Sequence, residues 1–262
     1  MTVPREQQRV FGEVAEDYDD VRPGYPAEIL DLIVGYAGRA PRTVAESGAG
    51  TGKGTALLRT LDAPLTCVEP DPAMAAVLSR RFGGDPLVSV TVGRFEDWTP
   101  PAGGVDLLAS AQAWHWVDHT RRTRLAADAL AAGGVLAVFG HDFGFADEDL
   151  RSAMNAVYQE HAPEIADQPG RPVNNRHPGA FRPEELRGSP WFTDVELQQV
   201  VTVVPYPTAR YLTLLTTFSP HRMLPEPQRV RLHGALADLV DAHGGVVEQK
   251  LTTDLWLARR TG

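Results

Sequence analysis

TVAESGAGTGKG, residues 43–54, is the stretch that decides the fold. Its first five residues are mostly small or apolar and predict a short buried strand, while TALLRTL after the glycines predicts a helix. A glycine-rich turn from a strand into a helix is typical of nucleotide-like ligand sites, because glycine lets the backbone pass close to a ligand without a Cβ in the way. The stretch therefore predicts a ligand site at a strand-to-helix turn.

The spacing of the glycines distinguishes between kinds of nucleotide site. A phosphate-binding P-loop fails at two positions, since Ser47 replaces its first glycine and Gly54 its last Ser or Thr. The dinucleotide fingerprint fails at Lys53, where a third glycine is needed. The pattern that fits is E-x-G-x-G-x-G, formed by Glu46, Gly48, Gly50 and Gly52. A carboxylate in that position suits a ligand with an ammonium group; an ordinary tight turn is the alternative.

A regular alternation of strands and helices surrounds this turn. Further strands are expected at 64–70, 87–93, 103–112 and 133–143, with helices at 71–82 and about 118–132. Such alternation predicts an α/β fold with a parallel, doubly wound sheet. Later strands are expected at 194–204 and 244–260, with helices near 207–218 and 226–243 between them. This helical insertion is expected over the carboxyl edge of the sheet, where open α/β sheets bind ligands.

A second acidic residue follows the second predicted strand. VEPDPAM places Glu69 at the carboxyl end of that strand. A carboxylate there can accept hydrogen bonds from both hydroxyls of a ribose. Glu69 alone could be an exposed strand-end acid, but its spacing from the glycine turn favours a shared nucleoside site.

Residues 8 to 143 carry motifs that resemble the class I S-adenosylmethionine-dependent methyltransferases. These are VAESGAGTG, VEPDPAM, GRFEDW, VDLLASAQAWHWVD and ALAAGGVLAVF, the last with Ala132 where proline is usual. FGEVAEDYDDVRPGYP is similar to the N-terminal cap of a small-molecule subgroup that includes trans-aconitate methyltransferase-like enzymes. The resemblance implies S-adenosylmethionine as cofactor and S-adenosylhomocysteine as product. The cofactor-binding residues that it and the motifs imply are Tyr18, Arg22, Glu46, Gly48, Ala49, Gly50, Thr51, Glu69, Pro70, Met74, Phe95, Glu96, Ala111, Gln112 and Trp116.

The same resemblance implies the organisation of the chain. We expect a Rossmann-like, doubly wound, mostly parallel seven-stranded sheet with an N-terminal helical cap and a late helical insertion. Residues 1–262 are expected to form a single methyltransferase domain, with the cap at 1–40 and the cofactor-binding core at 41–143. Residues 144–262 are expected to complete the core and to include a substrate lid near 205–243.

Three histidines are candidates for a general base, should the methyl acceptor have to lose a proton. His141 ends the fifth predicted strand, His115 lies between two tryptophans after the fourth, and His221 lies between two late helices. Histidine suits the role because its ordinary pKa of about 6.5 lets it accept a proton near neutral pH. We rank His141 first and His115 second. For each of them, a polar or packing role without chemistry is the alternative.

The composition of the chain limits which kinds of binding partner we expect. A formal net charge of −9 disfavours nucleic acid and anionic membranes. A single cysteine and an N-terminus without an apolar run predict a cytoplasmic protein, and the other histidines show no metal-ligand spacing. We therefore expect a small-molecule acceptor, no metal, and a monomer or homodimer. The alternatives are a methyltransferase for RNA or protein, and an S-adenosylmethionine-binding protein with other chemistry.

Overall fold

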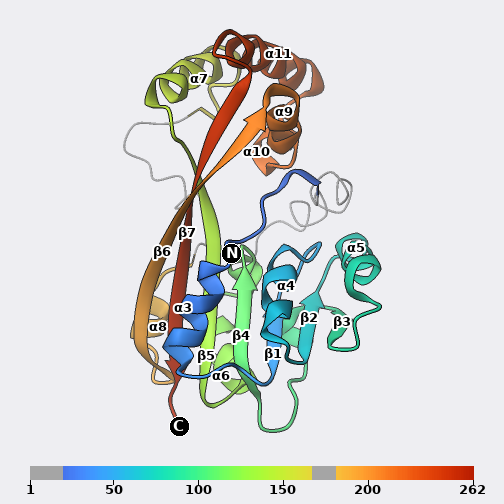
Figure 1. The fold of residues 1–262 in the computed structure, drawn as a ribbon, viewed down its shortest axis with the longest axis vertical. Coiled ribbons are helices and arrows are strands. Elements are labelled where there is room, and N and C mark those ends of the chain that lie inside the picture. The colour runs from blue at the N-terminus through green and yellow to red at the C-terminus, as the bar shows by residue number, and fades with distance from the viewer. Residues whose placement is uncertain (1–19, 167–180) are drawn as a thin grey trace.

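A seven-stranded sheet runs through the whole molecule (Figure 1). The computed structural model describes residues 20–166 and 181–262. The strand order is β3-β2-β1-β4-β5-β7-β6; the first five strands are parallel, and β7 is antiparallel to both of its neighbours. This order confirms the predicted doubly wound, mostly parallel seven-stranded sheet. In the described part of the chain, no helix is long and apolar enough to cross a membrane.

The first half of the chain alternates between strands and helices as predicted. Its elements are α3 (Glu28–Ala37), β1 (Val44–Ser47), α4 (Lys53–Leu58), β2 (Leu65–Glu69), α5 (Pro72–Phe82), β3 (Val88–Val92), β4 (Val105–Ala111) and α6 (Arg122–Ala129), with 3-10 turns at Arg59–Leu61, Phe95–Asp97 and Trp114–Trp116. The start of α5 shows how sequence sets a boundary: Asp71 caps the helix by accepting from the amides of Ala73 and Met74, and Pro72 takes the first helical position.

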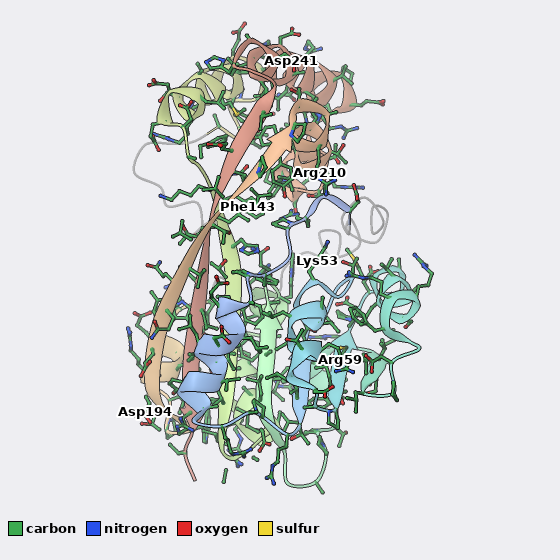
Figure 2. All side chains as sticks on the ribbon, in the orientation of Figure 1. Lys53, Arg59, Phe143, Asp194, Arg210 and Asp241 are labelled. Carbon is green, nitrogen blue, oxygen red and sulfur yellow. The ribbon has the colours of Figure 1, made fainter. Side chains whose placement is uncertain are left out.

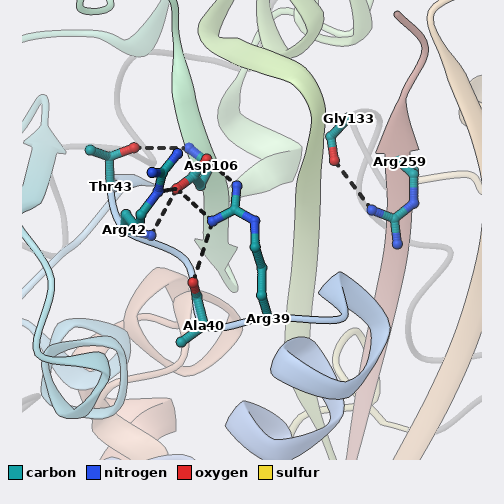
Figure 3. Close-up of polar contacts among 7 residues, drawn as sticks. All are labelled: Arg39, Ala40, Arg42, Thr43, Asp106, Gly133 and Arg259. Carbon is teal, nitrogen blue, oxygen red and sulfur yellow. Dashed lines mark hydrogen bonds and ion pairs between the residues drawn. The ribbon is translucent and has the colours of Figure 1, made fainter.

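Helices cover both faces of this half of the sheet. One apolar cluster lies under α3 and α4, where Ile29 and Ile33 are fully buried one helical turn apart. A second cluster lies on the opposite face under α6 and includes Trp114 and Phe95. At the amino ends of the strands, Asp106 pairs with Arg39 and accepts from the amide of Arg42 (Figure 3). These contacts fix the start of the sheet and leave its carboxyl ends facing the other half of the molecule.

Three long strands carry a second, helical part. These are β5 (Leu130–Phe145), β6 (Phe192–Pro207) and β7 (Val246–Arg260), which extend past the ends of β1, β2 and β4 (Figure 1). Their far ends hold what we call the helical lobe: α7 (Glu148–His161), α9 (Thr208–Thr216), α10 (Ser219–Met223) and α11 (Glu226–Ala242). This lobe has an apolar cluster of its own, and the short α8 (Glu184–Arg187) lies back at the base of β6. The predicted insertion thus lies beyond the carboxyl edge; β5 and β6 are longer than the sequence predicted, whereas β7 is slightly shorter.

The described N-terminal residues tie the two parts together. We call residues 20–25 the strap, since they run from the helical lobe to the start of α3 (Figure 1). Their backbone carbonyls accept hydrogen bonds from side chains of the late elements: Arg210 bonds Asp20 at 2.6 Å, and Tyr206 bonds Val21 at 2.9 Å. Figure 2 shows Arg210 on the side of the helical lobe that faces the strap. Of the predicted cap, residues 1–19 lie outside the described residues.

Candidate functional site

The glycine turn is built from left-handed backbone. The φ angles of Gly48, Gly50 and Gly52 are 70°, 58° and 95°, values that residues with a Cβ rarely adopt. Gly48 is required for a second reason, because a Cβ there would lie 2.3 Å from the Cβ of Ala113. The turn therefore lies directly against the segment that follows β4.

Glu69 fastens the turn to the end of β2. Its Oε2 accepts from the amide of Gly50 at 2.7 Å, and its Oε1 from the amide of Asp71 at 2.8 Å. Burial raises the pKa of Glu69 to about 7, against the opposing effect of the two amides. A carboxylate oxygen has two lone pairs, so each oxygen still has room for one ribose hydroxyl. The predicted ribose role is compatible with this geometry, and the fastening of the turn is a role that the sequence did not predict.

Glu46 has a carboxylate oxygen left over. The residue is fully buried, and its Oε2 accepts from the hydroxyl of Thr55 at 2.5 Å. Within the described part of the chain, its Oε1 has no hydrogen-bond partner, and neither has the buried hydroxyl of Thr51. Burial raises the pKa of Glu46 to about 8. An unpaired buried carboxylate is costly, so this arrangement suits a cationic ligand group such as an ammonium.

The segment after β4, residues 112–118, forms the next wall. Gln112 has a φ of 53°, and its amide side chain donates to the carbonyl of His141 at 2.8 Å. Trp114 is buried, whereas His115 and Trp116 are half-buried, with ring centroids 4.8 Å apart. Gln112 thus joins the end of β4 to β5, a structural role for a residue that is also predicted to contact the cofactor.

Phe95 and Glu96 support this segment from the turn after β3. The Phe95 ring packs in the core against Trp98 and Trp114, with centroids 5.9 and 6.0 Å away. Glu96 Oε1 accepts from the amide of Asp118 at 3.0 Å and pairs with Arg94. The resemblance implied that both flank an adenine ring, but in the structure both engage protein groups.

The other predicted cofactor residues lie in several parts of the molecule. Ala49 and Met74 are buried, Ala111 is half-buried at the end of β4, and Pro70 is exposed after β2. Tyr18 lies outside the described residues. Arg22 belongs to the strap, where it donates to the hydroxyl of Thr217 at 2.8 Å and lies 4.0 Å over the ring of Phe218. Arg22 therefore contacts the helical lobe rather than the turn.

His141 is an anchor for the strap. Its Nε2 donates to the carbonyl of Gly24 at 3.0 Å, and its Nδ1 accepts from the hydroxyl of Thr253 at 2.8 Å, an assignment that satisfies both acceptors. Its ring stacks on Tyr25, and burial lowers its pKa to about 4. With both nitrogens engaged, the geometry argues against the first-ranked base.

His221 is similarly engaged, inside the helical lobe. Its Nε2 lies 3.1 Å from the hydroxyl of Tyr158, and its Nδ1 lies 3.1 Å from Nε2 of His233. Burial lowers its pKa to about 3. Of the three candidates, His115 is the one on the segment beside the glycine turn. In residues 20–166 and 181–262, no group of three or more His, Cys, Asp or Glu could hold a metal ion.

Two supporting residues escaped the sequence analysis. Thr55 bonds Glu46 from the first turn of α4, and Arg122 donates to the carbonyl of Trp114 at 3.0 Å from the start of α6. Thr55 comes directly after the glycine pattern, nine residues from Glu46, and this short spacing could have indicated a contact between the two side chains. Arg122 gives no such signal, since its carboxylate partner Glu185 is 63 residues away.

Comparisons with known proteins agree with this geometry. Residues 45–138 match the family profile described as a methyltransferase domain. An uncharacterized methyltransferase of Mycobacterium tuberculosis H37Rv is 35% identical over 132 residues, 50% of this chain and 52% of that protein. A probable S-adenosylmethionine-dependent methyltransferase of Saccharomyces cerevisiae is 24% identical over 148 residues, 54% of this chain and 50% of that protein. The chain thus spans about half the length of these relatives.

Solved structures share the fold. A putative type II methyltransferase from Anaeromyxobacter dehalogenans superposes with a TM-score of 0.64 at 20% identity, covering 92% of this chain and 97% of the other. A phosphoethanolamine N-methyltransferase of Haemonchus contortus, in complex with S-adenosyl-L-methionine, gives a TM-score of 0.54 at 14% identity, covering 97% and 60%. The matched segment, residues 45–138, therefore resembles a methyltransferase domain, and the chain shares its overall fold with these solved structures.

Proposed function

We propose that this protein transfers the methyl group of S-adenosylmethionine to a small-molecule acceptor. The observation that carries the proposal is the pair of buried acids at the carboxyl ends of β1 and β2. Glu46 keeps an unpaired Oε1, and Glu69 is fixed by two amides with lone pairs to spare. An ammonium group and a ribose diol are the ligand groups that these acids would hold. The described residues therefore fit S-adenosylmethionine, which supplies a methyl group already activated on a sulfonium.

The chain's own task is then to bind, orient and exclude water. Glu69 would fix the ribose and Glu46 the amino end, while Gly48 and Gly50 let the backbone approach. The half-buried rings of His115 and Trp116 would form a wall of the acceptor space, and aromatic faces favour a nearby cation. Correct placement of two reactants is worth several orders of magnitude in rate. Such a site needs little further chemistry from the protein.

His115 is the base that we propose for an acceptor that must lose a proton. It lies on the segment beside the glycine turn, whereas His141 anchors the strap and His221 lies inside the helical lobe. For such an acceptor, His115→Ala should lower turnover about 10²–10⁴-fold. Cofactor binding should stay intact. Turnover at the wild-type rate across pH 6 to 9 would remove His115 from the mechanism.

A small acceptor, in the manner of the trans-aconitate methyltransferase-like subgroup, fits better than a macromolecule. The net charge of −9 opposes RNA, and the helical lobe lies beyond the carboxyl edge, where it limits the approach of a large substrate. A natural-product intermediate belongs to the same class of acceptor. We further propose that the protein works in the cytoplasm, without a membrane or nucleic-acid partner.

The test has two stages. Calorimetry should show micromolar binding of S-adenosylmethionine and S-adenosylhomocysteine; binding of NAD in their place would overturn the proposal. A panel of small acids, amines and phenols is then screened for formation of S-adenosylhomocysteine. Cofactor binding with turnover only on RNA or protein would favour a macromolecule methyltransferase. Cofactor binding without methyl transfer to any acceptor would favour other chemistry on the same fold.

A further inference from the structure

A fully buried guanidinium lies behind the segment that follows β4. The side chain of Arg122, in the first turn of α6, has no exposed surface. Its NH1 donates to the carbonyl of Trp114 at 3.0 Å. Its Nε and NH2 donate to the two carboxylate oxygens of Glu185 in α8, at 2.8 and 2.6 Å. One side chain thus links residues 112–118 to an element from the C-terminal half of the chain.

This arrangement fixes direction as well as distance. A guanidinium is planar, and a two-point bond to a carboxylate fixes that plane. With Glu185 on one edge of the plane, the remaining nitrogen is directed at the Trp114 carbonyl. The guanidinium is fully buried whereas the Glu185 side chain is 25% exposed, so loss of this carboxylate would remove the charge partner of a buried cation. Lysine, a single point donor, cannot make both contacts in this way.

The contact bears on the site because Trp114 is at the middle of residues 112–118. Gln112 fastens the start of this segment to β5, and Glu96 fastens the amide of Asp118 at its end. Arg122 holds the carbonyl between these points. The Cβ of Ala113 lies so close to Gly48 that a Cβ on Gly48 would clash with it. A shift at Trp114 would therefore also move the segment that packs against the glycine turn.

We propose that Arg122 is a positioning residue, oriented by Glu185, which holds residues 112–118 in the shape that binds the cofactor. The proposal rests on the proposed function, because the measured ligand is S-adenosylhomocysteine. It adds that α8, far from the glycine turn in sequence, sets the affinity of the cofactor site.

The experiment compares Arg122→Lys, Arg122→Met and Glu185→Gln with matched controls. Arg124→Met lies on the same helix in an exposed pair with Asp128, and Glu184→Gln lies in an exposed pair beside Glu185. S-adenosylhomocysteine is titrated by calorimetry and by tryptophan fluorescence, at a temperature where every variant is folded. The three test variants should bind about tenfold more weakly, since a hydrogen bond to a charged group is lost or misdirected. The controls should stay within twofold of wild type.

The double variant Arg122→Met/Glu185→Leu separates positioning from stability. Removal of both charges together should raise the Tm above that of Glu185→Gln, because the buried guanidinium no longer remains without its carboxylate. Its affinity should stay about tenfold below wild type, since the Trp114 carbonyl still lacks the guanidinium and keeps only the amide of Val117 among its described donors. Wild-type affinity in the double variant and in Arg122→Lys would overturn the proposal. If the wild-type protein itself fails to bind S-adenosylhomocysteine, the proposed function fails instead.

Discussion

The buried acids Glu46 and Glu69 and the buried histidines His141 and His221 are all candidate site residues in the sequence, but they differ in how completely the structure bonds them. Glu46 retains an unpaired oxygen, and Glu69 retains lone pairs beside a glycine turn. His141 and His221 have a partner at each ring nitrogen. A buried polar group that still lacks hydrogen-bond partners can bind a ligand. A buried polar group with all of its hydrogen bonds made within the protein stabilises the fold instead. Residual bonding capacity, more than residue type, therefore separates site from scaffold.

The sharpest test of this contrast is stability in acid. Burial lowers the pKa of His141 to about 4 and of His221 to about 3, below the ordinary value of about 6.5 in the unfolded chain. Below pH 6.5 the unfolded state therefore binds protons that the folded state does not. Each histidine should lower the free energy of unfolding by up to about 1.4 kcal/mol per pH unit as pH falls from 6.5 toward its folded pKa.

Denaturant unfolding between pH 6.5 and 4.5 measures this slope. His221→Leu lowers stability at pH 7, since Tyr158 and His233 lose a partner, but its slope should be shallower than wild type by about 1.4 kcal/mol per pH unit. The exposed His119→Ala serves as the control and should keep the wild-type slope. Identical slopes in all three proteins would mean that His221 does not resist protonation.

Glu69→Ala tests the other side of the comparison. It removes the acceptor of the Gly50 amide and the proposed acceptor of the ribose hydroxyls. Cofactor affinity should fall about tenfold or more, since a charge-assisted hydrogen bond contributes about 1.5–3 kcal/mol. Calorimetry with S-adenosylhomocysteine measures the change, and Asp97→Asn, an exposed acid after β3, is the control. Equal affinity in Glu69→Ala and wild type would exclude Glu69 from the ribose site.

Glu46 should make cofactor binding depend on pH. Burial raises its pKa to about 8 without ligand, and an ammonium group favours its ionised form. The affinity for S-adenosylmethionine should therefore rise with pH, by about tenfold from pH 6.0 to 7.5. Glu46→Gln cannot ionise, so its affinity should change less over the same range. Parallel curves for the two proteins would show that Glu46 does not face the ligand's charge.

The smallest expected effect concerns the strap. Tyr25 stacks on His141 with centroids 4.5 Å apart and meets Phe139 edge-on at 4.7 Å. Tyr25→Leu should cost about 1 kcal/mol of stability through the loss of these aromatic contacts. Tyr25→Phe keeps both ring contacts and should lose less stability in denaturant than Tyr25→Leu. Equal losses in the two variants would shift the explanation from ring packing to the hydroxyl.

The sequence was informative where chemistry is local. The turn from β1 into α4 follows from glycines within one short stretch, and Asp71 and Pro72 mark the start of α5. The ends of helices and strands were harder to predict from the sequence. The helix expected over 118–132 is α6, which ends at Ala129 because Leu130 already pairs with Val105 of β4. The strand expected to end at residue 143 continues to Phe145, where pairing with β7 outweighs two glycines and an aspartate.

The site shows the same limit at the level of side chains. Glu46 and Glu69 could be proposed as candidates from the sequence because each lies near the end of a predicted strand. The anchoring role of His141 could not be predicted from the sequence, because its partners Gly24 and Thr253 are 117 and 112 residues away. The contacts of Phe95 with the core and of Glu96 with Asp118 likewise appear only in the fold, and their place beside an adenine ring and its amino group stays a prediction.

The position of β7 between β5 and β6 has a consequence for how the chain is made. During synthesis, β1 to β5 emerge first and can assemble, since each pairs with a strand already present. The free edge of β5 must then wait for β7, whose Thr253 is 112 residues later than the His141 that it faces. An unpaired edge on a growing polypeptide invites pairing with other chains, and distant partners slow closure. The nascent protein thus passes through a stage in which the edge of β5 is open to other chains, and a chaperone that covers this edge would protect it until β7 arrives.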